Sequence, residues 1–260
     1  MLPDLARNLS LEGRIALVTG ASGSLGGRFA QVLAGSGAAV VLAARRLDAL
    51  QDLRDRLSAE GAVAHAVEMD VTSRDSVTAA VAQAEQMAAG PVDILINNSG
   101  IAQPGAALDQ DDEDWARVFA VNVEGARRAS VAVVRRLVQA GRPGAIVNVA
   151  SILGLRQGAG VSAYATSKAA LIQMTRQHAL EWARHRIRVN ALAPGYVETD
   201  LNRDFFAAEA GQAMIRRIPQ RRLGQAGELD GPLLLLASGA GSFMTGSVIV
   251  ADGGHLLSPL

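Results

Sequence analysis

Two residue types are scarce in this chain of 260 residues: cysteine is absent and lysine occurs once. Without cysteine the chain can form neither disulfide bonds nor thiolate metal sites, and it has no thiol nucleophile. Any redox chemistry must therefore use a diffusible cofactor. The absence of cysteine is compatible with a reducing compartment, and we expect a cytoplasmic protein.

An excess of charge of one sign is also lacking, because 25 basic residues balance 25 acidic ones. No global positive field is available for phosphate backbones, so no nucleic-acid partner is predicted. Pro3 and Asp4 stand where a secretory peptide has basic and apolar residues, and export is not expected. The uncharged stretch 231–251 is long enough for a membrane span, but Pro232 and several glycines divide it. No membrane association is predicted.

Clusters that could carry other chemistry have ordinary structural explanations. The four histidines have no spacing typical of metal ligands, so no metal site is predicted. The acidic run Asp109–Asp114 is typical of a helix start, where the helix dipole favours negative charge. The basic run Arg216–Arg222 is interpreted as solvated or subunit-contacting surface.

Seven short apolar runs alternate with longer segments of helical period. The runs are apolar on both faces, which is typical of parallel strands covered by helices on both sides. The pattern predicts one α/β domain, residues 13–260, built on a doubly wound parallel seven-stranded sheet and preceded by an N-terminal arm, residues 1–12. The expected strands are 15–19, 39–44, 63–67, 93–97, 145–149, 187–192 and 247–251, and the expected helices include 47–59, 74–89, 112–140, 163–185 and 228–238.

A glycine-rich loop follows the first expected strand and precedes a helix. It runs from Thr19 to Gly27 and reads TGASGSLGG. Glycines let the backbone approach a pyrophosphate, and the following helix offers free N–H groups and a partial positive charge at its N-terminus. The loop therefore predicts a dinucleotide site.

The single lysine, Lys168, follows Tyr164 by four residues, so the two side chains share one helix face. Free tyrosine has a pKa of about 10, which leaves roughly 0.1% phenolate at neutral pH. An ammonium ~4 Å away, at an effective dielectric constant of ~20, stabilises the phenolate by about 4 kcal/mol. The pair is expected to act as an acid or base towards a substrate, with Lys168 lowering the pKa of Tyr164.

The same motifs occur together in one family. The loop, Asp70-Val71, the NNSG segment of residues 97–100, the PGYVET segment of residues 194–199, and Ser151 upstream of the Tyr164/Lys168 pair resemble the short-chain dehydrogenase/reductase family. The resemblance is to its single-domain branch, with TGxxxGxG and YxxxK motifs, and it covers essentially the whole chain. It implies a Rossmann-like fold. Ser24 stands where the family has the middle glycine of the loop. We expect this serine to alter the affinity for the dinucleotide and not to abolish its binding.

The resemblance implies a role for each matching residue. Ser151 would polarise the substrate oxygen, and Tyr164 would be the general acid/base. Lys168 would lower the tyrosine pKa and bind the nicotinamide ribose, while Asn122 would complete a proton relay through water. The expected cofactor contacts are Thr19, Gly20, Ser22, Ser24, Leu25, Gly26, Arg45, Arg46, Asp70, Val71, Asn98, Tyr164, Lys168, Pro194, Gly195, Val197 and Thr199.

The choice of cofactor depends on the end of the second strand. A carboxylate there would accept hydrogen bonds from the ribose hydroxyls, whereas a guanidinium would pair with a 2′-phosphate. The sequence has Arg45 and Arg46 at this point and no acid before Asp48. NADP(H) is therefore favoured, with NAD(H) as the alternative.

These observations predict an NADP(H)-dependent oxidoreductase that interconverts a small ketone and a secondary alcohol, similar to carbonyl or 3-oxoacyl reductases. One alternative is an NAD-dependent polyol, sugar or hydroxy-acid dehydrogenase. Another is a non-catalytic nucleotide sensor, against which the intact Ser151, Tyr164 and Lys168 argue.

The substrate itself is left open by the sequence. The segment 199–219 is expected to form a lid over the substrate. Its apolar residues, Phe205, Phe206, Met214 and Ile215, favour a partly apolar substrate. Arg156 and Gln157 favour an oxygen-rich sugar acid instead.

The run Leu233–Leu236 predicts an interface between subunits. Four consecutive leucines cover every side of a helix turn, so at least one is expected to face something other than its own core. Together with the apolar last strand and the family resemblance, this predicts a homotetramer with two-fold symmetry.

Overall fold

The computed structural model describes residues 3–199 and 202–257, in which seven parallel strands form one sheet. The order across the sheet is β3-β2-β1-β4-β5-β6-β7. The chain builds outward from β1 to one edge and then crosses to β4 to build the other half, which is the doubly wound arrangement. The strands are β1 (Ile15–Thr19), β2 (Ala39–Ala44), β3 (Ala64–Glu68), β4 (Ile94–Asn97), β5 (Gly144–Val149), β6 (Ile187–Pro194) and β7 (Val248–Ala251).

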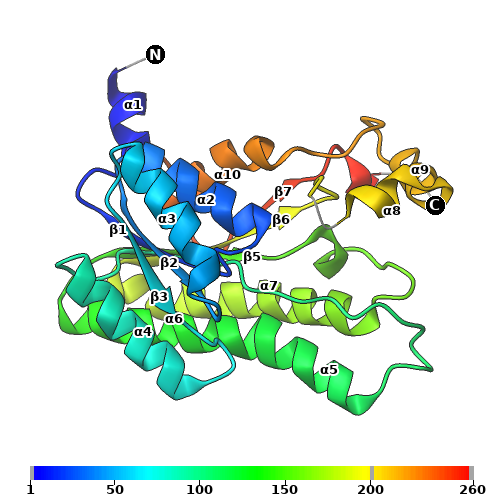
Figure 1. The fold of residues 1–260 in the computed structure, drawn as a ribbon, viewed down its shortest axis with the longest axis horizontal. Helices are drawn as coiled ribbons and strands as arrows, with labels where there is room; N and C mark the ends of the chain where they lie inside the picture. The colour runs from blue at the N-terminus through cyan, green and yellow to red at the C-terminus, as the bar shows by residue number, and fades with distance from the viewer. Residues whose placement is uncertain (1–2, 200–201, 258–260) are drawn as a thin grey trace.

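Helices cover both faces of the sheet, as Figure 1 shows. One face carries α2 (Ser24–Gly35), α3 (Asp48–Ala59) and α10 (Asp230–Ala237). The other carries α4 (Arg74–Met87), α5 (Asp112–Phe119), α6 (Ala126–Gln139) and α7 (Ser162–Trp182). The predicted fold class is confirmed.

Successive residues of a central strand enter opposite cores, because side chains alternate across a strand. In β2, Val40 and Leu42 pack in the core beneath α2 and α3, whereas Val41 and Ala43 pack in the core beneath α4 and α6. All four are fully buried. Burial on both sides is the physical reason why these runs are apolar throughout.

The predicted helix over 112–140 is wrong in one respect, because it is not continuous. A π-helical turn, Ala120–Gly125, separates α5 from α6. At Gly125 a Cβ atom would lie 2.8 Å from a methyl group of Val71, so the turn passes too close to the β3 loop for any side chain there. Such π-turns inside longer helices are frequent at functional sites.

Other boundaries differ only slightly from the prediction. β6 runs two residues further, to Pro194, and the helix expected over 163–185 is α7 followed by a 3-10 turn, Ala183–His185. The helix expected over 228–238 begins as a 3-10 turn, Ala226–Leu229, before α10. The acidic run does start a helix: Asp111 caps α5, accepting a hydrogen bond of 2.6 Å from the Asp114 amide.

The expected lid, 199–219, contains more regular structure than its sequence indicated. It holds two short helices, α8 (Arg203–Ala207) and α9 (Glu209–Ile215), while its residues 200 and 201 lie outside the described residues. Phe206 is buried with its ring edge-on to Tyr196, and Phe205 is about half exposed. The described part of the lid is therefore largely helical rather than irregular loop, although most of its residues are exposed.

The N-terminal helix α1 packs on the domain, and the leucines of α10 are buried to different degrees. Within the expected arm, α1 (Pro3–Leu9) contacts a 3-10 turn, Gly239–Gly241, and Leu11 is buried. In α10, Leu233 and Leu236 are fully buried, whereas Leu234 and Leu235 are half-buried. Within residues 3–199 and 202–257, no helix is both long and apolar enough to cross a membrane.

Candidate active site

The candidate site lies at the carboxyl edge of the sheet, where the strand order reverses between β1 and β4. Ligands of doubly wound sheets bind in the crevice outside this switch point. The loops after β1, β4, β5 and β6 all end here, because parallel strands share one carboxyl edge. These loops carry most of the residues that the sequence singled out.

The glycine-rich loop is joined to the β4 loop by hydrogen bonds. The Thr19 hydroxyl accepts hydrogen bonds from the amides of Asn98 and Ser99, at 3.0 and 3.1 Å. The Asn98 side-chain amide donates to the carbonyls of Thr19 and Gly20, at 3.1 and 3.2 Å. Thr19 and Asn98 therefore hold the shape of the cradle.

Two glycines of this loop are required by geometry. Gly20 has a φ of +64°. A Cβ atom at Gly26 would overlap the Gly20 carbonyl oxygen. Ser22 and Ser24 are exposed and Leu25 is half-buried, with Ser24 as the first residue of α2. The loop thus presents open backbone at a helix N-terminus, which suits a pyrophosphate.

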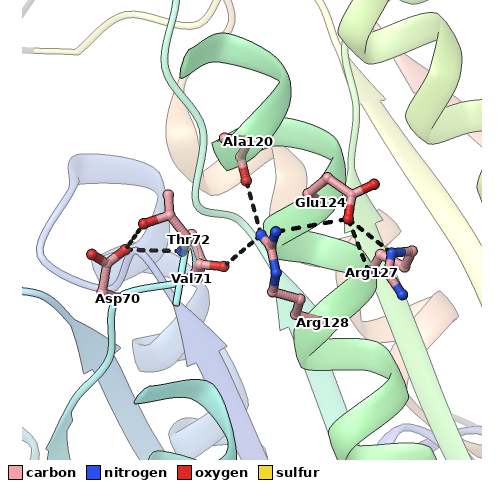
Figure 2. Close-up of polar contacts among 7 residues, drawn as sticks. All are labelled: Asp70, Val71, Thr72, Ala120, Glu124, Arg127 and Arg128. Atoms are coloured by element: carbon pink, nitrogen blue, oxygen red, sulfur yellow. Dashed lines mark hydrogen bonds and ion pairs between the residues drawn. The ribbon is translucent and has the colours of Figure 1, made fainter. Parts of the chain in front are cut away.

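The loop after β3 brings Asp70 and Val71 to the same edge, and Figure 2 shows their contacts. The Asp70 carboxylate accepts hydrogen bonds from the hydroxyl and amide of Thr72, at 2.7 and 2.9 Å. These two bonds lower the pKa of Asp70, and the charges of Arg45 and Arg128 lower it further. Arg128 also donates to the Val71 carbonyl at 3.4 Å, which ties this loop to α6.

Arg45 and Arg46 are both exposed immediately after β2. Arg45 lies close enough to Asp70 for its charge to help lower the Asp70 pKa. The guanidinium is therefore next to the loop expected to contact the adenosine part of a dinucleotide.

Ser151 and Tyr164 come together from different elements. Ser151 is buried after β5, and its hydroxyl accepts a hydrogen bond from the Leu153 amide at 3.1 Å. Burial raises the pKa of the Tyr164 phenol; its hydrogen bond with Ser151 lowers the pKa in part, and the nearby Tyr196 phenol raises it. The two hydroxyls are thus within reach of one substrate oxygen.

Lys168 is fully enclosed beside this pair. Its Nζ donates to the Val149 carbonyl at 2.8 Å and lies 5.6 Å from the centre of the Tyr164 ring. Burial lowers the pKa of Lys168 to about 8. The net pKa of Tyr164 is raised rather than lowered, because burial of the phenol outweighs its hydrogen bond with Ser151.

Asn122, in the π-helical turn, is bonded on every side by protein. Its side-chain amide donates to the Ile101 carbonyl and the Ser167 hydroxyl, each at 2.9 Å, and its Oδ1 accepts from the Ile101 amide at 2.8 Å. A Cβ atom at Gly100 would lie 3.3 Å from Lys168 Nζ and 3.4 Å from Asn122 Oδ1. Asn122 therefore borders the Lys168 end of the site.

The segment after β6 closes the opposite side. A Cβ atom at Gly195 would lie 2.7 Å from Asp252, so Pro194-Gly195 passes directly over the end of β7. Val197 is buried and bridges to Gly224, and the Thr199 amide donates to Asn202 Oδ1 at 2.9 Å. Most of the expected cofactor contacts belong to loops or strand ends at this carboxyl edge; Ser24, Leu25 and Gly26 are in the first turn of α2, and Tyr164 and Lys168 are on α7.

One neighbour of the site was missed by the sequence reasoning, which considered His255 only as a metal ligand. It is buried, and its ring lies 5.5 Å from that of Tyr196. The signal available in the sequence was its position: it follows β7 by a few residues, and β7 ends at the same edge as the other site strands.

The fold and this edge define the class of protein, a Rossmann-like α/β nucleotide-binding protein. A model of the short chain dehydrogenase family matches residues 14–210. Two curated relatives are galactitol 2-dehydrogenase (L-tagatose-forming) of Cereibacter sphaeroides, 41% identical over 94% of this chain and 96% of the relative, and a 3-oxoacyl-acyl-carrier-protein reductase of Pseudomonas aeruginosa, 35% identical over 96% of this chain and 100% of the relative.

A solved structure with a similar fold is a gluconate 5-dehydrogenase of Burkholderia cenocepacia in complex with NADP and tartrate. It has a TM-score of 0.93 and 34% identity, and the match covers 98% of this chain and 100% of that one. The chain belongs to the short-chain dehydrogenase family. It is an NAD(P)-dependent oxidoreductase that interconverts a ketone and an alcohol.

Proposed function

We propose that Ser151, Tyr164 and Lys168 carry out this reaction with NADP(H) as the preferred cofactor, on a small, hydroxyl-rich substrate. The observation that carries the proposal is the convergence of the three side chains at the sheet's switch point. The nicotinamide dinucleotide supplies or accepts the hydride.

Ser151 and Tyr164 bind the substrate oxygen, and Tyr164 transfers its proton. Ser151 and Tyr164 both bond to the carbonyl oxygen, which orients it and draws electron density from the reacting carbon. Tyr164 then donates its proton to the oxygen as the alcohol forms, or removes it in the reverse direction. Burial raises the pKa of the Tyr164 phenol, so the chain without cofactor holds this proton on the phenol.

Lys168 and Asn122 support this step. The Lys168 ammonium is held by the Val149 carbonyl at the floor of the site, where it favours the tyrosinate form after the proton has left. Its Nζ lies near Gly100, and there it would also bind a ribose hydroxyl. Asn122 fixes the loop around Ile101 and would lead a proton to solvent through water.

The cradle fits a dinucleotide, because Ser22 and Ser24 are exposed at the N-terminus of α2, while Gly20 and Gly26 allow the loop to pack closely against the β4 loop and its own backbone. Thr19, Gly20, Ser22, Ser24, Leu25 and Gly26 would hold the pyrophosphate; Asp70, Val71 and Asn98 the adenosine side; and Pro194, Gly195, Val197 and Thr199 the nicotinamide side. Arg45 and Arg46 would pair with a 2′-phosphate, which supports NADP(H). NADP is the cofactor in the complex of the Burkholderia cenocepacia relative.

The substrate class is supported by the wall beyond Tyr164. Tyr196 and Arg156 give it polar groups, while Phe206 is buried against Tyr196 and so takes no part in an open apolar surface. Galactitol and gluconate dehydrogenases among the relatives agree with this choice. The polar wall favours polyols and hydroxy acids as substrates over the acyl thioesters that a 3-oxoacyl reductase would take.

The test is a substrate panel followed at the nicotinamide absorbance with NADP⁺ and NAD⁺. We expect polyols and sugar acids to be oxidised, and to be oxidised faster with NADP⁺ than with NAD⁺. Turnover of only a 3-oxoacyl thioester, or faster turnover with NAD⁺, would contradict the proposal.

We further propose a cytoplasmic homotetramer. Half-buried Leu235 on α10, together with exposed Val250 on the edge strand β7, supports pairing of these elements across subunits. Sedimentation at micromolar concentration should give about four times the 27.0 kDa chain mass. An active monomer would argue against this assignment.

A further inference from the structure

The last described turn of the chain joins three segments of the substrate wall. It is a 3-10 turn, His255–Leu257, that follows β7. The Gly253 carbonyl accepts from the Gln220 amide at 3.2 Å, and a Cβ at Gly254 would lie 3.1 Å from Pro219. The end of the lid is therefore seated on the residues between β7 and this turn, and Figure 1 shows β7 running towards α8 and α9.

His255 faces the candidate site from this turn. Its side chain is 8% exposed, and its ring lies 5.5 Å from Tyr196, whose phenol is in turn near Tyr164. Among the described residues, its buried Nδ1 has no hydrogen-bond partner. A buried polar atom without a partner is costly, and no acceptor in the described part of the chain holds a proton on Nδ1, so Nε2 is the ring nitrogen left to donate to a ligand.

Arg156 reaches the same point from the loop after Ser151. One terminal nitrogen, Nη1, donates to the His255 carbonyl at 2.6 Å. This bond fixes the guanidinium next to the histidine. A guanidinium has five N–H donors, so one such bond leaves most of them for a ligand.

The charges around His255 have an excess of positive sign. Burial lowers the pKa of His255, Arg156 and Arg217 lower it further, and Asp252 opposes them. Both carboxylate oxygens of Asp252 already accept backbone hydrogen bonds, from Gly254 at 2.8 Å and Leu256 at 2.7 Å. Near His255 there are thus two guanidinium groups and one carboxylate, and that carboxylate already accepts hydrogen bonds from the backbone of its own turn.

We propose that Arg156 and His255, supported by Arg217, form a subsite for the carboxylate of a hydroxy-acid or keto-acid substrate. The carboxylate would accept a charge-assisted hydrogen bond from Arg156 and another from His255, while Ser151 and Tyr164 hold the reacting oxygen. This inference rests on the proposed function and narrows it from hydroxyl-rich compounds in general to their acids.

The experiment compares pairs of compounds that differ only in a carboxylate and a hydroxymethyl group: gluconate with glucitol, and glycerate with glycerol. Oxidation by NADP⁺ is measured for the wild type and for Arg156→Gln, Arg217→Gln and His255→Phe, the last of which keeps a ring against Tyr196. The wild type should prefer the acid of at least one pair by tenfold or more in kcat/KM. Arg156→Gln and His255→Phe should each raise KM for that acid about tenfold more than they raise KM for its neutral partner.

Arg216→Gln is the matched control, because Arg216 is an exposed neighbour of Arg217 and the charge change is the same. It should leave the acid preference unaltered. If the wild type oxidises the neutral and acidic members equally, or if His255→Phe raises both KM values alike, the subsite is wrong and the proposed function stands. If the wild type oxidises none of the four compounds and only a thioester is turned over, the proposed function fails and the subsite with it. Should Arg156→Gln not fold, His255→Phe alone decides.

Discussion

The cofactor half of the candidate site and its substrate half differ in how their polar groups are used. In the cofactor half, Thr19 and Asn98 bond to backbone of neighbouring loops, so the cradle is held by protein alone. In the substrate half, His255 keeps an unpartnered buried nitrogen and Arg156 makes one bond to protein in the described residues.

The difference indicates where specificity is encoded. In the cradle the side chains already bond to protein, so the ligand is recognised mainly by backbone N–H groups and by the shape of the loop. This mode of recognition suits a phosphate group, which many enzymes bind. A wall with unused donors recognises its ligand through side chains, which change easily between relatives. Substitutions in the two halves should therefore differ in effect, and the residue at their junction should matter most.

The largest effect is expected from Tyr164→Phe, which removes the proton but keeps the ring. The rate constant kcat should fall by about 10³-fold, the range of general acid–base catalysis. Because the cradle is held by other residues, the dissociation constant for NADPH should stay within about twofold. Stopped-flow rates and fluorescence titration of NADPH measure the two quantities. Appreciable turnover in this variant would contradict the role of Tyr164.

Lys168→Arg should be the next most damaging, although it keeps the charge. The ammonium is enclosed between the Val149 carbonyl and the neighbourhood of Gly100, where the wider guanidinium has no room. The guanidinium would lie away from the position of the ammonium, and misplacement of a catalytic group by about 1 Å should lower kcat/KM by roughly 100-fold. Steady-state kinetics provide the measurement, and near-normal values would mean that the shape of this cation is unimportant.

Arg45→Asp addresses cofactor choice at the far end of the cradle. Removing a charge-assisted phosphate contact of ~1.5–3 kcal/mol should weaken NADPH relative to NADH by about 10- to 100-fold. Paired titrations of the two cofactors measure the ratio. Arg56→Asp, which changes the same charge at an exposed position on α3, is the control and should leave the ratio unaltered.

The smallest effect concerns stability and pH. In the folded chain burial lowers the pKa of Lys168 to about 8, whereas an unfolded lysine keeps its proton up to about pH 10.4. Between these values the unfolded state binds more protons, so raising the pH favours the folded state. From pH 8 to pH 9 the free energy of unfolding should rise by about 1 kcal/mol more in the wild type than in Lys168→Met. Denaturant unfolding at the two pH values tests this, and equal changes would contradict a charged, buried Lys168.

Much of the fold was predictable because its signals are local. Strands apolar on both faces require cover on both sides, and β1 and β2 occur within the predicted limits. The π-helical turn was not predictable, since it depends on Asn122 bonding to Ile101 and Ser167 and on Gly125 passing Val71. These contacts join residues far apart in the chain.

The candidate site divides in the same way. The glycine-rich loop and the Tyr164/Lys168 pair are short motifs whose spacing alone places them on a turn and on one helix face. The direction of the Tyr164 pKa was missed because burial, which raises it, is a property of the assembled site. His255 was missed because no motif marks it, and only the parallel arrangement of β7 beside β6 brings it to Tyr196.

The sequence by itself therefore determined the class of fold, the cradle and the pair of residues that moves the proton, because each depends on periodicity or on spacing within one element. Only the tertiary structure decided which polar groups remain unpartnered, how burial alters the pKa values of Tyr164 and Lys168, and that the turn after β7 brings His255 to the substrate wall. Those properties depend on desolvation and on contacts between segments, and neither is local in the chain.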